Sequence, residues 1–389
     1  MKQKRRFQMK RVTFKMLVGV FMIWTLTVFT FGQISEVQCH RHGRVRKQLD
    51  AYLNGLVKEG KFSGSALVAK DGKIILKKGY GMANYEEEKP NRPVTVFSIA
   101  SMSKAFTAVS ILMLQDQGLL NIHDTIDQYL PWFPYGDQIT IHHCLSHTSG
   151  LFLYLNDANS DFWVYGDLTK YYEPYELLDY FVNRPLYFEP GTDWMYCNSG
   201  YVVLGIIIEE LSGMTFREFI NTNILKPLRM RHTSYDQYGT DFLNQKAVGY
   251  AANPPLYPPE WFKWQPSVIY SAGGMFSTVV DMYKWDQALY TNKLLSRDAL
   301  KAMFSPYAEN YGYGWFNTYM DHNGQMHKQI WHPGTMPGFH SIINRFVDDR
   351  LTVILLANVS TPYVDLSNLS HFDLKYFSED LARIVLDNK

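Results

Sequence analysis

The chain has 389 residues, of which 46% are hydrophobic, 15% aromatic and 19% charged, so it is neither disordered, collagen-like nor a disulfide scaffold. At roughly 100–200 residues per domain, the length allows one large or two medium domains. The net charge of +1 includes seven Lys or Arg and one acid in residues 1–38, which leaves 31 basic and 36 acidic residues in the rest. That balance excludes nucleic acid as a partner.

The amino terminus carries a basic cluster followed by an uncharged apolar run, Met16 to Phe31. This order is typical of an export segment. Its length, about 24 Å as a helix against roughly 30 Å of hydrocarbon, leaves both a cleaved signal peptide and an uncleaved anchor open. The absence of a small-x-small cleavage motif after the run favours an anchor. We therefore expect residues 1–38 to associate with the cell membrane and residues 40–389 to work outside the cytoplasm.

The first part of this body predicts a helix and then a hairpin. Apolar residues recur at helical spacing from His40 to about Gly60. Two short apolar runs follow, Ser65 to Ala69 and Lys73 to Tyr80, and Asp71-Gly72 joins them. Because Asp-Gly accepts the positive φ angles of a tight turn, these runs are expected to pair as antiparallel strands.

A very apolar segment, Ser101 to Gln117, predicts a buried helix with Ser101 as its N-cap and Gly118 as its C-terminal cap. Further helices are expected over Gly200 to Leu211 and Thr215 to Leu225, separated by loops rich in Tyr, Trp and Pro. At the carboxyl end, strands are expected over Ser341 to Phe346 and Leu351 to Asn358, and a helix over Phe377 to Leu386.

Strands at both ends with helices between them predict an α/β (α+β) fold, with one mixed, mainly antiparallel sheet flanked by helices. The sheet domain would comprise residues of about 40–118 and 266–389. A mainly helical domain would be inserted over about 119–265. We expect the active site where the sheet and the insert meet.

The first chemical motif is Ser101 with Lys104. Three residues apart on a helix, the two side chains share one face. A serine hydroxyl is a weak nucleophile that needs a neighbouring base, and the lysine amine can be that base. The spacing alone is weak evidence, but its position at the start of the apolar helix places the hydroxyl where it can face a cleft.

Two further motifs lie near predicted helix and strand starts. Tyr196 and Asn198 precede the helix at Gly200. A lysine ammonium can lower the pKa of a neighbouring tyrosine, which would then act as a base, and an asparagine can orient a substrate amide. His332 and Gly334 precede the strand at Ser341. Each pattern alone is also explained by an ordinary loop tyrosine, a helix-capping asparagine or a structural histidine.

The order S-x-x-K, Y-x-N, H-x-G resembles the family of class C serine β-lactamases, D-alanyl-D-alanine carboxypeptidases and related esterases and D-peptidases. The resemblance covers residues 47 to 386, and with the apolar segment in front the chain looks most like the membrane penicillin-binding proteins of this group. Flanking segments that look like family landmarks are Phe97 to Lys104, Leu145 to Leu151, Pro190 to Thr192, Ile224 to Leu228, Ala272 to Thr278 and Tyr313 to Trp315.

The resemblance implies that Ser101 is acylated and that Lys104 assists its deprotonation. Tyr196 would pass the proton to the leaving group and later activate water, and Asn198 would hold the substrate amide. The N–H groups of Ser101 and Thr335 would form the oxyanion hole, with His332 and Gly334 beside the substrate. Whether Lys104 or Tyr196 is the base stays open at this point. No metal or cofactor is expected.

Two residues depart from the lactamase pattern. His332 stands where lactam hydrolases carry a lysine, and a histidine is mostly neutral at pH 7. This favours peptidase or esterase activity over β-lactamase activity. Cys197 replaces the serine common inside Y-x-N, and we expect it to have no chemical role. His143 and His147 have i, i+4 spacing, but no H-E-x-x-H motif supports zinc binding.

The expected function is therefore an extracytoplasmic serine hydrolase that forms an acyl-enzyme on peptide or amide bonds of cell-wall type, as a carboxypeptidase or D-peptidase would. An esterase or weak β-lactamase of the same family is the alternative. A slow-turnover penicillin-binding sensor or scaffold is a further alternative. The small-molecule partners would be a cell-wall peptide, a β-lactam or an ester.

Overall fold

The computed structural model describes residues 43–155, 157–236, 238–242, 244–251, 264–359 and 373–388. The apolar run Met16 to Phe31, on which the export prediction rests, lies outside these residues, as does Cys39. Within them no single helix is long and apolar enough to span a membrane, and one bent pair, Asn198–Ser212 with Phe216–Leu228, meets the length and hydropathy criteria at an angle of 77°.

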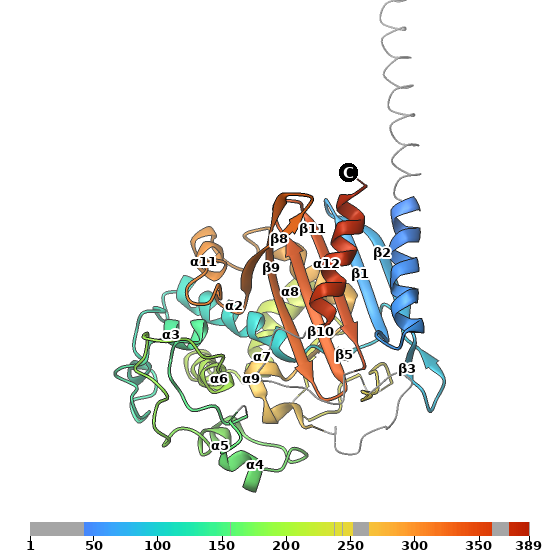
Figure 1. Ribbon diagram of the computed structural model, residues 1–389. Helices are drawn as coiled ribbons and strands as arrows, with labels where there is room; N and C mark the ends of the chain where they lie inside the picture. Colours follow the sequence, from blue (N-terminus) through green and yellow to red (C-terminus); the bar gives the residue numbers. More distant parts are fainter. Residues whose placement is uncertain are drawn as a thin grey trace, which may run out of the picture.

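A six-stranded sheet forms the centre of the molecule (Figure 1). Its order is β2-β1-β11-β10-β9-β8, and every neighbouring pair is antiparallel. The amino-terminal hairpin lies beside the carboxyl-terminal strand, with Leu67 opposite Ile354. The antiparallel sheet built from both ends of the chain is thus confirmed. Its strands are β1 (Gly64–Lys70), β2 (Lys73–Tyr80), β8 (Phe316–His322), β9 (Gln325–Met336), β10 (Phe339–Phe346) and β11 (Leu351–Ala357).

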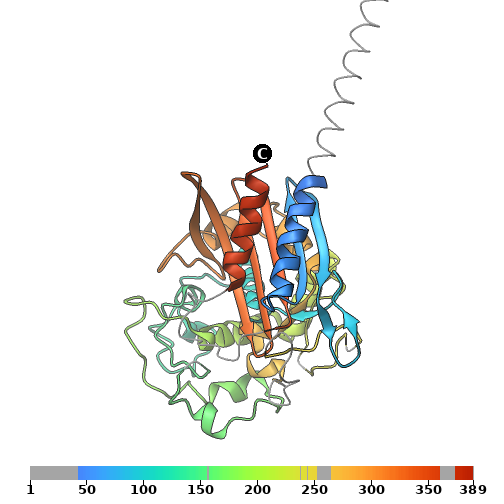
Figure 2. The same cartoon turned by 45° about the vertical axis from the view of Figure 1, so that its right-hand side comes forward.

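The two faces of this sheet bury different sets of side chains. On β1, Ala66 and Val68 pack on one face, whereas Leu67 and Ala69 pack on the other, as the period of two in a strand requires. Two helices cover the first face, one over 43–58 and α12 (Asp373–Leu386), and Figure 2 shows them side by side. The second face contacts α10 (Val279–Ala288) and shares one apolar core with α2 (Ser103–Asp116).

The helix expected from Ser101 is present with a different start. A 3-10 turn over Ala100–Met102 precedes α2, and the Ser103 hydroxyl, not that of Ser101, bonds back to the Ala100 carbonyl at 2.6 Å. The N-cap prediction for Ser101 is therefore wrong, because this residue lies inside the turn. Gly118, at φ +72°, follows the helix as expected.

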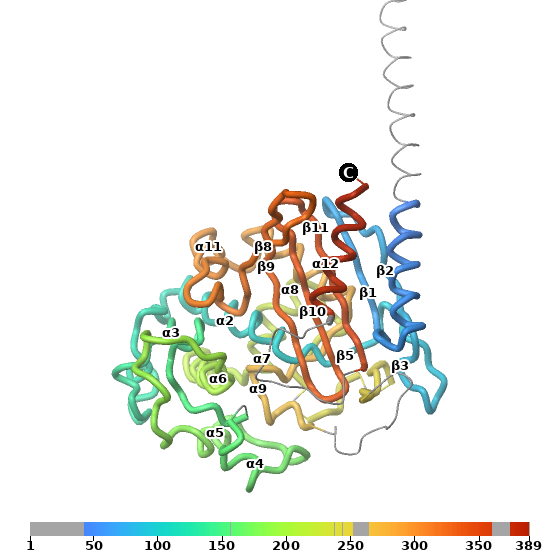
Figure 3. The backbone as a smooth tube through the Cα atoms, viewed as in Figure 1, coloured from blue at the N-terminus to red at the C-terminus, as the bar shows by residue number. Residues whose placement is uncertain are grey.

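The middle of the chain is mainly helical and joined by long irregular loops, which Figure 3 traces between α3 and α6. The helix expected over 215–225 is α7 followed by a π-helical segment. The apolar side chains of these helices share one core with the sheet, and the boundaries of the inserted domain stay a prediction. The elements are α3 (Ile141–Ser146), α4 (Asp161–Tyr165), α5 (Pro174–Leu178), α6 (Asn198–Ser212), α7 (Phe216–Ile220), α8 (Lys226–Leu228), α9 (Tyr270–Gly273), α10 (Val279–Ala288) and α11 (Arg297–Met303).

Short strands complete the fold. β5 (Phe97–Ser98), β7 (Met275–Ser277) and β6 (Ser234–Tyr235) form a three-stranded sheet in the order β5-β7-β6, and β3 (Met82–Asn84) pairs with β4 (Lys89–Pro90). β5 leads directly into the turn at Ala100–Met102. Its pairing with β7 therefore fixes the position of Ser101.

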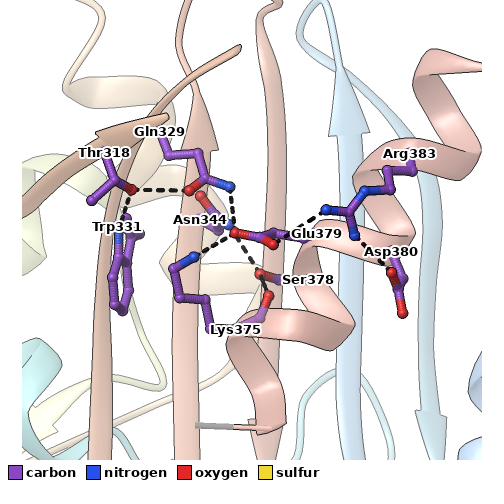
Figure 4. Close-up of polar contacts among 9 residues, drawn as sticks. All are labelled: Thr318, Gln329, Trp331, Asn344, Lys375, Ser378, Glu379, Asp380 and Arg383. Carbon is purple, nitrogen blue, oxygen red and sulfur yellow. Dashed lines mark hydrogen bonds and ion pairs between the residues drawn. The ribbon is translucent and has the colours of Figure 1, made fainter. Parts of the chain in front are cut away.

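A polar layer holds α12 on the sheet (Figure 4). The Glu379 carboxylate accepts a hydrogen bond from Gln329 at 2.9 Å and pairs with Lys375, while the Asn344 amide donates to the Ser378 hydroxyl at 3.0 Å. These contacts satisfy polar groups that the sheet would otherwise bury without partners, which fixes the register of the helix over the strands.

The opposite face contains a buried ion pair. The Arg345 guanidinium on β10 donates to the Asp286 carboxylate on α10 at 2.7 Å, and Thr352 on β11 donates to the same carboxylate at 2.9 Å. The two charged side chains are 1% and 0% exposed. Each charge depends on the other, because neither reaches water.

We expect Asp286→Ala to lower the free energy of unfolding by about 3–5 kcal/mol, since it leaves the Arg345 cation buried and uncompensated. Urea denaturation followed by circular dichroism measures this change. The double variant Asp286→Leu/Arg345→Met should recover most of the loss. A cost for Asp286→Ala no larger than that of Asp71→Ala in the exposed hairpin turn would contradict this role.

Candidate active site

The Lys104 amine is the centre of the site. Its Nζ lies 3.2 Å from the Ser101 hydroxyl, 2.7 Å from the Asn198 side-chain oxygen and 2.8 Å from the Ala272 carbonyl. The side chain is fully buried. Burial lowers the pKa of Lys104 well below its ordinary value. When this amine is deprotonated, its two N–H bonds can be accepted by the two carbonyl oxygens, which leaves its lone pair for the Ser101 proton.

Three elements converge on this amine. Lys104 extends from α2, Asn198 is the first residue of α6, and Ala272 lies in α9. Gly205 lets α6 and α9 approach, since a Cβ there would lie 2.2 Å from the Ser271 hydroxyl. The Thr107 hydroxyl on α2 donates to the Ser271 carbonyl at 2.7 Å. These close contacts fix the positions of the acceptors around Lys104.

Tyr196 lies against the same pair. The Lys104 Nζ is 4.7 Å from the centre of its ring. Burial raises the pKa of Tyr196, and a hydrogen bond with Ser101 opposes that effect only in part. The expectation that a lysine ammonium lowers the pKa of this tyrosine is therefore wrong, because burial of the Tyr196 ring itself is the largest effect and disfavours the phenolate.

His147 holds the segment that carries Tyr196. Its carbonyl accepts a hydrogen bond from the Met195 N–H and its Nδ1 accepts one from the Cys197 N–H, both at 3.0 Å. The His147 and Tyr196 rings are 4.3 Å apart. Burial lowers the pKa of His147 well below its ordinary value. The neutral ring therefore carries its proton on Nε2.

Sequence reasoning had treated His147 only as part of a landmark segment and as a weak zinc candidate with His143. The structure gives the two residues different partners, because the His143 Nδ1 accepts from the backbone N–H of Thr140 at the start of α3. His147 follows a short helix and takes a left-handed φ of +64°. Its position just after that helix is the one signal in the sequence.

His332 lies in β9 and is 1% exposed. Its Nδ1 bonds to the Pro333 carbonyl at 2.6 Å, and its Nε2 bonds to the Tyr311 hydroxyl at 3.0 Å. Since Nδ1 must donate to a carbonyl, Nε2 accepts from the phenol. Burial lowers the pKa of His332 to about 3. The histidine is neutral, and it offers no cation to a substrate carboxylate.

Tyr311 is the residue of this group that sequence analysis did not single out. Its ring lies 4.6 Å from His147 and makes a T-shaped contact with Phe316. Tyr311 thus connects the histidine on β9 with the histidine that holds Tyr196.

Gly334 and Thr335 precede the strand at Ser341, as expected, and they themselves lie in β9, where they pair with Ser341 and His340 on β10. A Cβ on Gly334 would lie 2.2 Å from the Ile99 carbonyl, so only glycine lets β9 contact the turn that holds Ser101. The neighbouring Thr335 hydroxyl is buried and has no hydrogen-bond partner among the described residues.

The residue that caps the start of α6 is Cys197, and Asn198 is the first residue of the helix. The Cys197 sulfur caps α6 by accepting from the Gly200 N–H at 3.4 Å, so the asparagine is not the cap. Burial raises the pKa of this thiol. A buried, protonated thiol is a poor nucleophile, which agrees with the expectation that Cys197 has no chemical role.

Comparisons with known proteins show which family the chain belongs to. The Beta-lactamase family profile matches residues 49–376. The chain belongs to this family of serine hydrolases. Penicillin-binding protein 4* of Bacillus subtilis is 34% identical over 331 residues, which cover 80% of this chain and 72% of that protein.

Solved structures agree with the family fold. The crystal structure of a penicillin-binding protein from Bacillus halodurans matches with a TM-score of 0.72 and 27% identity, over 86% of this chain and 99% of that one. A D-amino acid amidase from Ochrobactrum anthropi SV3 matches with a TM-score of 0.72 and 23% identity, over 89% of this chain and 98% of that one, which shows a common fold.

We expect His147→Leu to lower kcat about 100-fold with little change in KM, because displacing a positioned proton donor by about 1 Å costs that much. His147→Asn should retain most of the rate, since its amide oxygen can accept from the Cys197 N–H and asparagine tolerates a left-handed backbone. Steady-state kinetics on a small ester measure both, and melting curves control for folding. Equal losses in the two variants would contradict the positioning role.

The pH dependence of acylation should show no histidine step between about pH 5 and 8. A protonated Lys104 cannot accept the Ser101 proton, so the rate should fall as pH drops below the lowered pKa of Lys104 and level off above it. His332→Gln should change the height of this profile and not its position, because His332 has a pKa of about 3. Stopped-flow acylation rates measure the profile. A midpoint that moves in His332→Gln would assign the titration to the histidine.

Proposed function

We propose that the protein is an extracytoplasmic serine hydrolase that cleaves amide or peptide bonds of cell-wall type through an acyl-enzyme on Ser101. The observation that supports this most directly is the fully buried Lys104 amine, whose Nζ lies within hydrogen-bond distance of the Ser101 hydroxyl, the Asn198 side-chain oxygen and the Ala272 carbonyl. A buried amine with a lowered pKa can accept the proton of the hydroxyl beside it.

The proposed first step joins the Ser101 oxygen to the substrate carbonyl carbon while Lys104 takes the hydroxyl proton. The oxyanion that forms would be held by the backbone N–H groups of Ser101 and Thr335. The C–N bond then breaks, and the proton leaves Lys104 through the Tyr196 phenol to the departing amine. Water hydrolyses the ester by the reverse proton path, which releases the acid and restores Ser101.

The neutral state of His332 bears on the substrate. A carboxylate placed against this residue would find no positive charge, whereas a neutral amide or a following peptide unit would not need one. The arrangement therefore favours a D-peptidase or amidase over a carboxypeptidase or β-lactamase. The relationship to penicillin-binding protein 4* supports penicillin as a probe of the same serine.

We also propose that the catalytic body lies outside the cytoplasm. The seven basic residues and the apolar run Met16 to Phe31 would hold the chain in the membrane with its catalytic body outside. Cell-wall peptides lie on that side.

The test treats the full-length chain in detergent, beside its Ser101→Ala variant, with fluorescent penicillin and with one peptide ending in D-Ala-D-Ala as free acid or as amide. Intact mass spectrometry should show one penicillin adduct, absent from Ser101→Ala. Cleavage should be about tenfold faster for the amide, and His332→Lys should reverse this preference, since one charge-assisted contact is worth about 1.5–3 kcal/mol.

The outcomes separate the alternatives. An adduct that persists in Ser101→Ala would refute the nucleophile. A stable adduct without cleavage of any peptide or ester would favour the sensor or scaffold, and rapid release of hydrolysed lactam would favour a β-lactamase. Preference for the free acid in the unaltered enzyme would refute the inference from His332.

A further inference from the structure

A second pocket lies beside α7, α8 and β6, and none of the active-site residues lines it. It encloses about 500 Å³, within the roughly 300–1,000 Å³ of small-molecule sites. Its charged lining is mostly basic, and its apolar lining includes two aromatic rings. The basic residues are Arg217, Lys226, Arg229 and Arg231, the acid is Asp241, and Leu225, Met230, Tyr235 and Phe242 are apolar or aromatic.

Most of these cations have no acidic partner. Arg217 pairs with Asp241 at 2.9 Å and donates to the Tyr235 carbonyl at 3.3 Å. No carboxylate of the described residues lies within 4.0 Å of a side-chain nitrogen of Lys226, Arg229 or Arg231, all of which are exposed. Three unpaired cations on one pocket repel one another, and a bound anion would relieve that repulsion.

The surroundings add positive charge. Lys284 donates to the Arg229 carbonyl at 2.6 Å, and Lys293 donates to the Pro227 carbonyl at 2.8 Å. Only Lys284 has an acidic partner here, Asp281, at 2.7 Å. This concentration of cations contrasts with the rest of residues 39–389, where acids outnumber basic residues. It is a local feature that the net charge of the chain does not show.

Arg229 has an uncommon backbone conformation for an arginine. The residue ends α8 in the left-handed conformation at φ +55°. This conformation costs a non-glycine residue roughly 1–2 kcal/mol, and glycine would adopt it freely. Arg229 lines the pocket, so Arg229→Gly would remove its charge without straining the backbone.

We propose that this pocket is a second ligand site, which binds a phosphate group carried by a small molecule, a polymer or a lipid headgroup. Arginine guanidinium groups match phosphate oxygens in pairs, and a phosphate carries more charge than a carboxylate for three unpaired cations to neutralise. Ser234 also lines the pocket, and its hydroxyl has no partner among the described residues. Tyr235 and Phe242 provide a surface for the uncharged part of the ligand.

The test titrates the full-length chain in detergent with glycerol phosphate and, separately, with mixed micelles of a phospholipid that carries the same headgroup. Isothermal titration measures the dissociation constant. Arg229→Gly and Arg231→Gln should each weaken binding about tenfold or more, as the loss of a charge-assisted contact does. Arg229→Gly should also keep or raise the melting temperature, because glycine suits the left-handed position. Binding to the soluble probe identifies a soluble or polymeric source, and binding to the micelles alone identifies a lipid.

Two controls make the result specific. Lys77→Gln removes one exposed cation from β2, outside the pocket, and should leave the dissociation constant unchanged. Ser101→Ala should bind as the unaltered chain does, which separates this site from the active site. The proposal is overturned by no binding in either arm, by equal weakening in Lys77→Gln and Arg229→Gly, or by loss of binding in Ser101→Ala.

Discussion

The burial of one amine determines how the rest of this active site works. Lys104 is enclosed by α2, α6 and α9, and the cost of desolvating an ammonium there keeps it neutral. Burial raises the pKa of the neighbouring Tyr196. The shared environment thus pushes the pKa values of an amine and a phenol in opposite directions.

The sheet supplies the other half of the site by bringing distant segments together. The pairing of β5 with β7 fixes the turn that holds Ser101, and Gly334 lets β9 lie against that turn without a side chain between them. The buried pair of Arg345 and Asp286 joins the same sheet to α10. A core that shares its apolar contacts between sheet and helices keeps these parts in one arrangement.

Two neutral histidines, His147 and His332, contribute hydrogen bonds and no charge to the site. His147 accepts from the Cys197 N–H beside Tyr196, and His332 accepts from Tyr311. Both rings have lowered pKa values because they are buried near Lys104. A charged histidine at either position would lose its acceptor nitrogen, so the low pKa values preserve the positions of Tyr196 and Tyr311. Neither histidine brings a positive charge to the active site. Exposed cations gather in the separate pocket around Arg229.

The sequence alone determined the elements with strong local signals. The hairpin at Asp71-Gly72, the terminal strands, α6 and α12 follow from periodicity and turn chemistry, and the three motifs identified Ser101, Lys104, Tyr196, Asn198 and His332. Only the tertiary structure decided their chemistry. Protonation depends on burial and on partners such as Ala272, His147 and Tyr311, which lie far away in the chain. β8 and β9 escaped prediction because β9 is buried on both faces from Gln329 to Gly334, so its sequence lacks the period-two pattern of a half-exposed strand.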